Sequence, residues 1–162
     1  MSETGEDIRG VLIQVLGGRV LLPNATVSEV ITLSEPDPVE GAPDWLLGRI
    51  PWRGWRLPLF SFGVFSGLAT HEPAETARVS VLKALGSHKR LPFIAMLAQG
   101  FPRLTTLRSD IVIPFEDDEE LPTGVLARVS IRDDIALIPD MEFIEDRIAE
   151  ALGLEAEAAE TA

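Results

Sequence analysis

The two histidines, His71 and His88, are the side chains on which acid–base or metal chemistry would most readily depend. His71 follows Ser66 in a glycine-containing stretch, but closeness along a loop is not the geometry of a catalytic Ser–His pair. We therefore interpret His71 as a solvated loop residue. His88 stands beside Lys89 and Arg90 on a predicted turn. A solvated turn is the simpler interpretation, and a docking contact with an acidic partner is the alternative.

The acidic run at residues 116–120 is the second candidate for chemistry, because carboxylate oxygens are the ligands that Ca²⁺ and Mg²⁺ prefer. The run lacks the alternating spacing and central glycine of an EF-hand loop, and contiguous carboxylates repel one another. A solvated loop is therefore expected, with an acidic-loop metal-binding protein as an alternative. Nucleotide-binding glycine motifs and a hydrolase Gly-x-Ser-x-Gly elbow are absent from the sequence. The chain also has no cysteine, which excludes disulfides, thiol catalysis, cysteine-bound zinc and iron–sulfur clusters. Since the sequence contains no recognisable catalytic or metal-binding motif, we expect no catalytic residue, no metal site and no cofactor.

A cluster of tryptophan and arginine lies between residues 45 and 56. It comprises Trp45, Arg49, Trp52, Arg53, Trp55 and Arg56, and it includes all three tryptophans of the chain. These two residue types are the ones most often found as hot spots of protein–protein binding. We expect Trp45 to belong to the core. Arg53 stands beside Gly54 at a predicted hairpin tip, where we expect an exposed contact or an orienting role.

The size and charge of the chain limit its class. It has 162 residues and a mass of 17.7 kDa, which suit one domain or two small lobes sharing a core. The formal net charge of -12 disfavours a nucleic-acid partner and an anionic membrane surface. The N-terminus is acidic and lacks the positive start and apolar core of a secretory signal. We expect a cytoplasmic protein without direct membrane insertion.

Prolines and glycines interrupt the middle of the chain too often for long helices, so short strands and turns are expected. Three hairpins are predicted: 11–16 with 19–22 about Gly17-Gly18, 49–52 with 55–60 about Arg53-Gly54, and 124–131 with 135–138 about residues 132–134. Further strands are expected at 29–33, 76–85, 91–97 and 104–112, a helical turn at 43–47 that ends at Gly48, and a loose connection at 61–75.

The closing segment carries the one strong helix signal. Asp140 is a suitable N-cap, acidic residues follow it, and apolar residues recur at helical spacing up to Gly153. We therefore expect small β-barrels closed by a terminal helix. The predicted boundaries are a disordered lead at 1–9, a two-lobed domain at 10–152 and a mobile Ala/Glu tail at 153–162.

Several blocks of sequence together resemble one known family. The blocks are Leu21-Leu22-Pro23, Val27-Ser28-Glu29-Val30-Ile31, Pro43-Asp44-Trp45-Leu46-Leu47-Gly48-Arg49-Ile50, Arg53-Gly54, Leu57-Pro58-Leu59 and Ile135-Ala136-Leu137-Ile138-Pro139-Asp140. They resemble the CheW-like domain of bacterial chemotaxis adaptors over about residues 10–152. The resemblance implies a mostly β, CheW-like fold of two intertwined SH3-like five-stranded β-barrels with a C-terminal helix. It also implies a scaffold rather than an enzyme.

The middle of the chain departs from the family pattern. Residues 91–104 replace the family's usual Gly-l-x-Val-Asp-x-Val strand with a segment that contains Gln99-Gly100-Phe101-Pro102. Together with the neighbouring blocks, this segment is most similar to the ChpC-type subgroup, whose members accompany the chemosensory systems of type IV pili and twitching motility.

The resemblance implies two partners: the cytoplasmic hairpin of a methyl-accepting chemoreceptor and the regulatory domain of a CheA-type histidine kinase. It places Val27, Glu29 and Val30 on the receptor-facing stretch, and Arg53 and Gly54 on a turn that matters for receptor–kinase coupling. Opposite charges suggest that Glu29 and Arg53 pair, while core packing is the alternative role of the two valines. One alternative stays open, in which the chain uses the same barrel fold to bind proteins in an unrelated process, because a fold does not determine a function.

Overall fold

The computed structural model describes residues 8–73, 77–86, 88–107, 112–114, 120–131 and 134–154. The strands are β1 (Ile8–Val15), β2 (Gly18–Pro23), β3 (Val27–Thr32), β4 (Leu46–Trp52), β5 (Trp55–Phe60), β6 (Arg78–Lys83), β7 (Phe93–Ala98), β8 (Arg103–Leu107), β9 (Val112–Pro114), β10 (Val125–Ile131) and β11 (Asp134–Pro139). The helices are a single 3₁₀ turn, η2 (Asn24–Thr26), and the α-helices α1 (Phe62–Phe65) and α2 (Met141–Ala151). The predicted lead begins outside the described residues, but Ile8 and Arg9 already belong to β1. Tail residues 155–162 also lie outside them.

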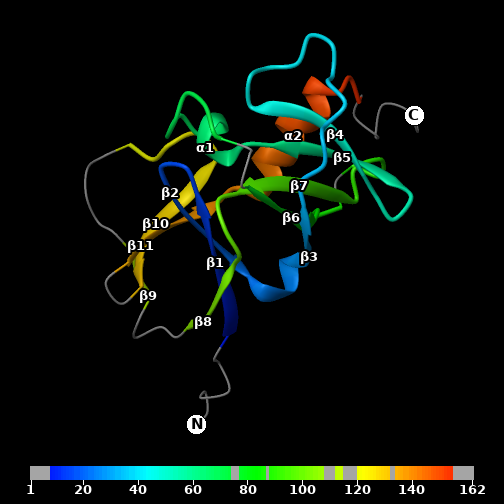
Figure 1. Cartoon of the computed structure of the whole chain (residues 1–162). Helices are drawn as coiled ribbons and strands as arrows, with labels where there is room; N and C mark the ends of the chain where they lie inside the picture. Colours follow the sequence, from blue (N-terminus) through cyan, green and yellow to red (C-terminus); the bar gives the residue numbers. More distant parts are fainter. Residues whose placement is uncertain are drawn as a thin grey trace.

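Two sheets share the chain in an interleaved order. One sheet has six strands in the order β8-β1-β2-β11-β10-β9, and the other has five in the order β3-β6-β7-β5-β4. The chain therefore begins in the six-stranded sheet, crosses to build the whole of the other, and returns, with α2 behind the second sheet in Figure 1. The predicted mostly β, intertwined architecture with a C-terminal helix is confirmed. The one difference in strand number is the short β9, which extends the first sheet beside β10.

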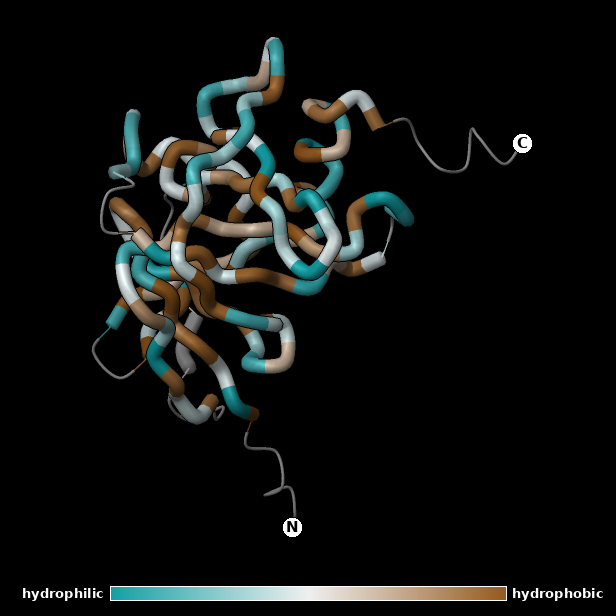
Figure 2. Tube along the Cα trace, turned by 45° about the vertical axis from the view of Figure 1, so that its right-hand side comes forward, coloured by the Kyte–Doolittle hydropathy of each residue, from teal (hydrophilic) through white to brown (hydrophobic). Residues whose placement is uncertain are grey.

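Three apolar clusters hold these layers together. One fills the six-stranded unit and is built on Leu12 and Val129, and another fills the five-stranded unit around Leu59 and Val81. The largest lies between them and includes Ile144 of α2. Figure 2 shows the same pattern, with hydrophobic stretches along the interior strands and hydrophilic ones at the loops. The apolar face of the C-terminal helix, which the sequence predicted, therefore covers a core to which both sheets contribute.

Two local predictions about turns were wrong. In the first hairpin Val15 pairs with Gly18, so the turn is made by Leu16 and Gly17, and Gly18 already belongs to β2. The expected helical turn at 43–47 is a tight turn instead, and β4 begins at Leu46. Both errors have one cause. A glycine indicates that the backbone adopts an unusual conformation at that position, but it does not show whether the position belongs to a turn, a strand or a helix end.

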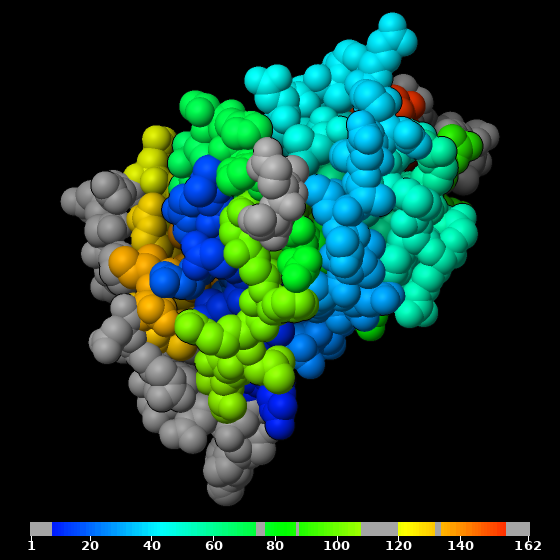
Figure 3. Space-filling model, viewed as in Figure 1, coloured from blue at the N-terminus to red at the C-terminus, as the bar shows by residue number. Residues whose placement is uncertain are grey.

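Gly48 illustrates that requirement. Its φ is +141°, and a Cβ there would lie 2.4 Å from the carbonyl oxygen of Asp37. The loop before β4 crosses the strand at this point, where Asp37 and Arg49 exchange backbone hydrogen bonds of 2.8 and 2.9 Å. In Figure 3 the loop and β4 cover the right-hand part of the molecule as one packed surface. Gly48 therefore lets the loop lie directly on the hairpin that carries the tryptophan and arginine cluster.

The connection predicted as loose at 61–75 contains α1. Ser61 caps this helix, because its Oγ accepts the backbone N–H of Val64 at 3.1 Å. The long C-terminal helix behaves as predicted. Asp140 accepts the N–H of Phe143 at 3.1 Å, and Gly153 with φ +76° follows the last turn.

Candidate functional site

The β4–β5 hairpin supplies the first part of the site. Trp52 pairs with Trp55, which leaves Arg53 and Gly54 as a two-residue turn. Both have positive φ, +48° for Arg53 and +84° for Gly54, as a tight hairpin turn requires. Arg53 is the one non-glycine residue with positive φ in the described part of the chain. The hairpin geometry therefore holds a long charged side chain at its tip.

Strand β3 supplies the second part. Glu29 accepts three hydrogen bonds on Oε1: from Trp52 Nε1 at 2.9 Å, and from Arg53 Nε at 3.2 Å and Nη2 at 3.0 Å. The Arg53 guanidinium also lies 5.2 Å from the centre of the Trp52 ring. We call this arrangement of Glu29, Trp52 and Arg53 the clip. It contains the predicted Glu29–Arg53 pair, together with a third member that the sequence did not assign to it.

The clip lies at the surface. The Arg53 side chain is 69% exposed and that of Glu29 37%, whereas Trp52 is buried. Exposed ion pairs contribute only about 0.2–1 kcal/mol to folding, because water and salt screen them. The contribution of the Glu29–Arg53 ion pair to stability is therefore small. Its geometry is suited to presenting a fixed carboxylate and a fixed guanidinium to another molecule.

The two valines of the predicted site lie on the same edge strand as Glu29. Strand β3 is at the end of its sheet and pairs only with β6 in the described structure. Val27 is half-buried and packs against the largest core cluster, while Val30 is half-buried opposite Ser80. The structure therefore brings Glu29, Arg53 and Gly54 together, with Val27 partly committed to the core.

The three tryptophans have different environments. Trp45 packs against the largest core cluster, with its ring 4.8 Å from that of Phe65 in an edge-to-face contact. Trp52 is buried as part of the clip, and Trp55 is 44% exposed beyond the turn. The expected core role of Trp45 and the exposed position of Arg53 both agree with the structure.

A buried carboxylate joins three further segments, and the sequence did not reveal it. Glu72 is 4% exposed, and it accepts the backbone N–H of Leu16 at 3.0 Å, the Ser61 hydroxyl at 2.5 Å and Gln99 Nε2 at 3.0 Å. We call these four residues the Glu72 node. It connects the first hairpin, the N-cap of α1 and the end of β7. Gln99 belongs to the segment that departs from the family pattern, which was the one available signal.

Helix α2 carries a second buried carboxylate. Glu145 is 1% exposed and accepts the backbone N–H of Leu85 at 2.8 Å. Burial raises the pKa of Glu145, and the Leu85 N–H and nearby His88 oppose that shift in part. His88 itself lies 2.8 Å from Asp146 of the same helix. The histidine expected on a solvated turn therefore contacts α2 within the molecule.

The raised pKa of Glu145 predicts a pH dependence of stability. The folded protein binds the proton more tightly than the unfolded chain, so the contribution of Glu145 is greatest below the free glutamate pKa of about 4.3. This contribution is lost as the pH rises through the folded pKa. Glu145→Gln removes the titration and keeps an oxygen for Leu85. In urea unfolding, we expect the free energy of unfolding of the variant, relative to that of the wild-type protein, to increase from about pH 4 to pH 7. A difference in the free energy of unfolding that does not change with pH would contradict this.

The acidic run at 116–120 lies outside the described residues except for Glu120. Within the described ranges, no group of three or more histidine, aspartate or glutamate side chains is arranged to hold a metal ion. No helix in the same ranges combines the length and apolar character needed to cross a membrane.

The fold of this chain has a counterpart among solved structures. The structure is similar to the crystal structure of the scaffolding protein TtCheW from Thermoanaerobacter tengcongensis, with a TM-score of 0.67 and 15% sequence identity, over 82% of this chain and 84% of that one. Comparison with curated protein sequences found no significant match.

The family model described as the CheW-like domain matches residues 9–148. The chain belongs to this family, and its two sheets with the closing helix form a CheW-like fold.

Proposed function

We propose that this chain is a non-enzymatic adaptor that couples the cytoplasmic hairpin of a chemoreceptor to the regulatory domain of a CheA-type histidine kinase. The CheW-like family is a family of non-catalytic scaffolds in chemotaxis signalling, which supports the general role. The contacts with a chemoreceptor and with a CheA-type kinase go beyond this general role and are what we propose. In this role the chain works in the cytoplasm and is recruited to receptor arrays at the membrane, without inserting into the bilayer.

The clip is the observation that carries the proposal. It holds Glu29 and Arg53 at the surface in a fixed relation. The family resemblance places Glu29 on the receptor-facing stretch and Arg53 on the turn associated with receptor–kinase coupling. All three bonds within it end on Oε1 of Glu29, so within the described part of the chain the second carboxylate oxygen is available to a partner's donor. The edge strand β3 beside it offers unpaired backbone groups to the same partner.

The pathway that we propose is the one controlling type IV pili and twitching motility. The support is the resemblance of segment 91–104, with its Gln99-Gly100-Phe101-Pro102 stretch, to the ChpC-type subgroup. In the structure this segment forms β7 and the beginning of β8, and its Gln99 belongs to the Glu72 node. A strain lacking this chain is expected to lose twitching and to keep flagellar chemotaxis. The reverse result would place the chain in the flagellar pathway while leaving the adaptor role intact.

The direct test is reconstitution of the complex from purified parts. We expect this chain to co-elute in size-exclusion chromatography with the regulatory domain of the cognate CheA-type kinase, and with a receptor cytoplasmic fragment. Both interactions need to occur together in one ternary peak for the proposal to stand. If the chain elutes alone in every mixture, what is left is a CheW-like domain with a different binding role.

A further inference from the structure

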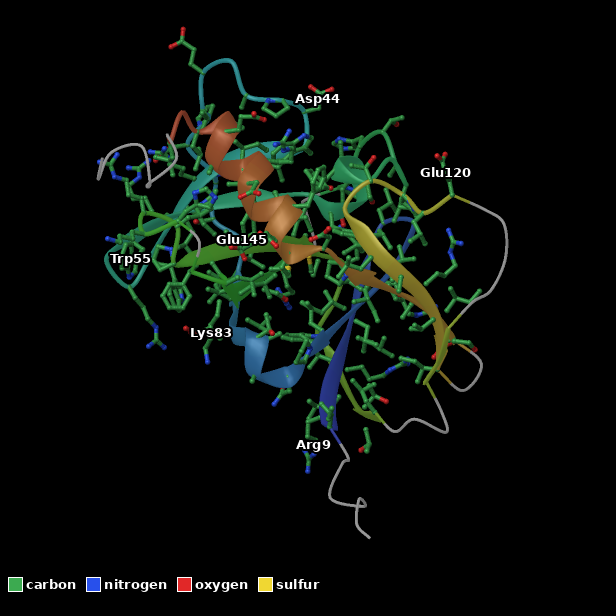
Figure 4. The ribbon with its side chains drawn as sticks, turned by 180° about the vertical axis from the view of Figure 1, so that it is seen from behind. Arg9, Asp44, Trp55, Lys83, Glu120 and Glu145 are labelled. Carbon is green, nitrogen blue, oxygen red and sulfur yellow. The ribbon has the colours of Figure 1, made fainter. Side chains whose placement is uncertain are left out.

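A groove lies beside the β4–β5 hairpin, next to the clip, because Trp52 of the clip contacts the groove residue Phe93. It has a volume of about 190 Å³ and is lined by strand residues, by residues before β7 and by the end of α2. The lining side chains used below are Arg49, Arg56 and Arg90, with Trp55, Phe93 and Leu154. We call this the arginine groove. Figure 4 shows Trp55 on the same side of the molecule as the last turn of α2.

The arginine groove combines positive charge with exposed aromatic surface. Three arginines line it, and none of its described lining residues is acidic. The exposed ring of Trp55 lies 6.5 Å from that of Phe93, so two neighbouring aromatic rings line the groove. Arg56 is oriented by Asp37 at 2.7 Å from outside the groove. In a chain of net charge -12, this surface is complementary to a segment that carries carboxylates between small apolar residues.

The last described residue of the chain, Leu154, lies in the lining of the groove. Helix α2 ends in a glycine turn, in which the N–H of Leu154 returns to the carbonyl of Ala149 at 2.8 Å and that of Gly153 to Glu150 at 3.1 Å. This turn places Leu154 in the lining of the groove. The eight residues that follow Leu154 in the sequence, 155–162, read Glu-Ala-Glu-Ala-Ala-Glu-Thr-Ala. An extended chain of that length reaches up to about 27 Å, ample to follow the groove.

We propose that residues 155–162 dock in the arginine groove of their own chain, with glutamates on the arginines and alanines against Trp55. Tethering at Leu154 gives the tail an effective concentration in the millimolar range, so weak contacts suffice to hold it. The tail covers Trp55 and thereby competes with any acidic partner for this surface. This proposal is independent of the adaptor role, because it concerns contacts within one chain.

A spin label tests the docking on the full chain. The sequence has no cysteine, so Ala159→Cys gives a single site for a nitroxide. The measurement is paramagnetic broadening of the indole N–H signal of Trp55, with that of core Trp45 as internal reference. We expect strong broadening at Trp55, falling roughly three-fold at high salt because ion pairs at a surface are screened.

Two neutralised variants separate docking from simple proximity. Replacing Glu155, Glu157 and Glu160 by glutamine keeps the length of the tail but removes its negative side chains. We expect this variant to show the same reduction in broadening of the Trp55 signal as high salt produces. Arg49→Gln in the groove should act in the same direction, whereas Arg9→Gln in the other sheet should leave the broadening unchanged. Equal broadening in the charged and neutral tails would overturn the proposal. Broadening transferred from a labelled chain to an unlabelled one in a mixture would also overturn it, because the occupant would then be a second copy.

Discussion

Glu29→Lys is expected to lower the affinity of this chain for the receptor fragment and for the kinase regulatory domain by about ten-fold or more, the scale of a binding hot spot. The substitution removes the acceptor of the Trp52 indole and both bonds from Arg53. It also places a second cation beside the guanidinium. Arg53 then loses the orientation in which a partner would meet it. Isothermal titration with each purified partner measures the change.

A matched control separates lost recognition from lost folding. Glu40→Lys makes the same charge change in an exposed loop residue and is expected to bind as the wild-type protein does. Because the clip is largely exposed, Glu29→Lys is expected to reduce the free energy of unfolding by only about 1–2 kcal/mol. Arg53→Glu should reproduce the binding defect. Unchanged binding in both clip variants would show that the partners contact another surface.

Glu72→Leu is expected to have the largest effect on stability, a loss of about 3–5 kcal/mol in the free energy of unfolding. Leucine fills a similar volume but accepts no hydrogen bond. The backbone N–H of Leu16, the Ser61 hydroxyl and the Gln99 amide would then lose their shared acceptor in the interior. Leaving buried donors unpaired costs the full penalty of removing them from water. Urea unfolding followed by tryptophan fluorescence measures the loss.

The same substitution at an exposed site calibrates this result. Glu40→Leu changes a loop glutamate without described hydrogen bonds and should alter stability by no more than about 0.5 kcal/mol. A loss of under 1 kcal/mol in Glu72→Leu would mean that water or neighbouring groups satisfy the three donors, and that the Glu72 node is not what fixes the segments it joins.

The clip could be predicted from sequence in part, because its charged members belong to recognisable blocks. Arg53-Gly54 is a hairpin-turn signal, and Glu29 lies in a short β-branched run. Opposite charge then made their pairing a specific hypothesis, and the structure confirms it. The contribution of Trp52 was not predictable, because nothing in the sequence indicates which way its indole N–H points.

The Glu72 node was beyond sequence analysis for a different reason. Its members are separated by up to 83 positions, and each is an ordinary polar residue in an unremarkable setting. Only the crossing of the chain between the two sheets brings them together. Likewise, the sequence indicated that Gly48 occupies a position where glycine is needed. Only the tertiary structure shows that the loop containing Asp37 lies across it.

The central claim is that this chain couples a receptor to a kinase, and receptor control of kinase autophosphorylation tests it most directly. The cognate receptor, in membrane vesicles, is mixed with the CheA-type kinase, and labelled phosphate on the kinase is followed over time. We predict that receptor changes the phosphorylation rate only when this chain is present, and that Glu29→Lys abolishes the change. A rate that responds equally to receptor with and without the chain would contradict the account.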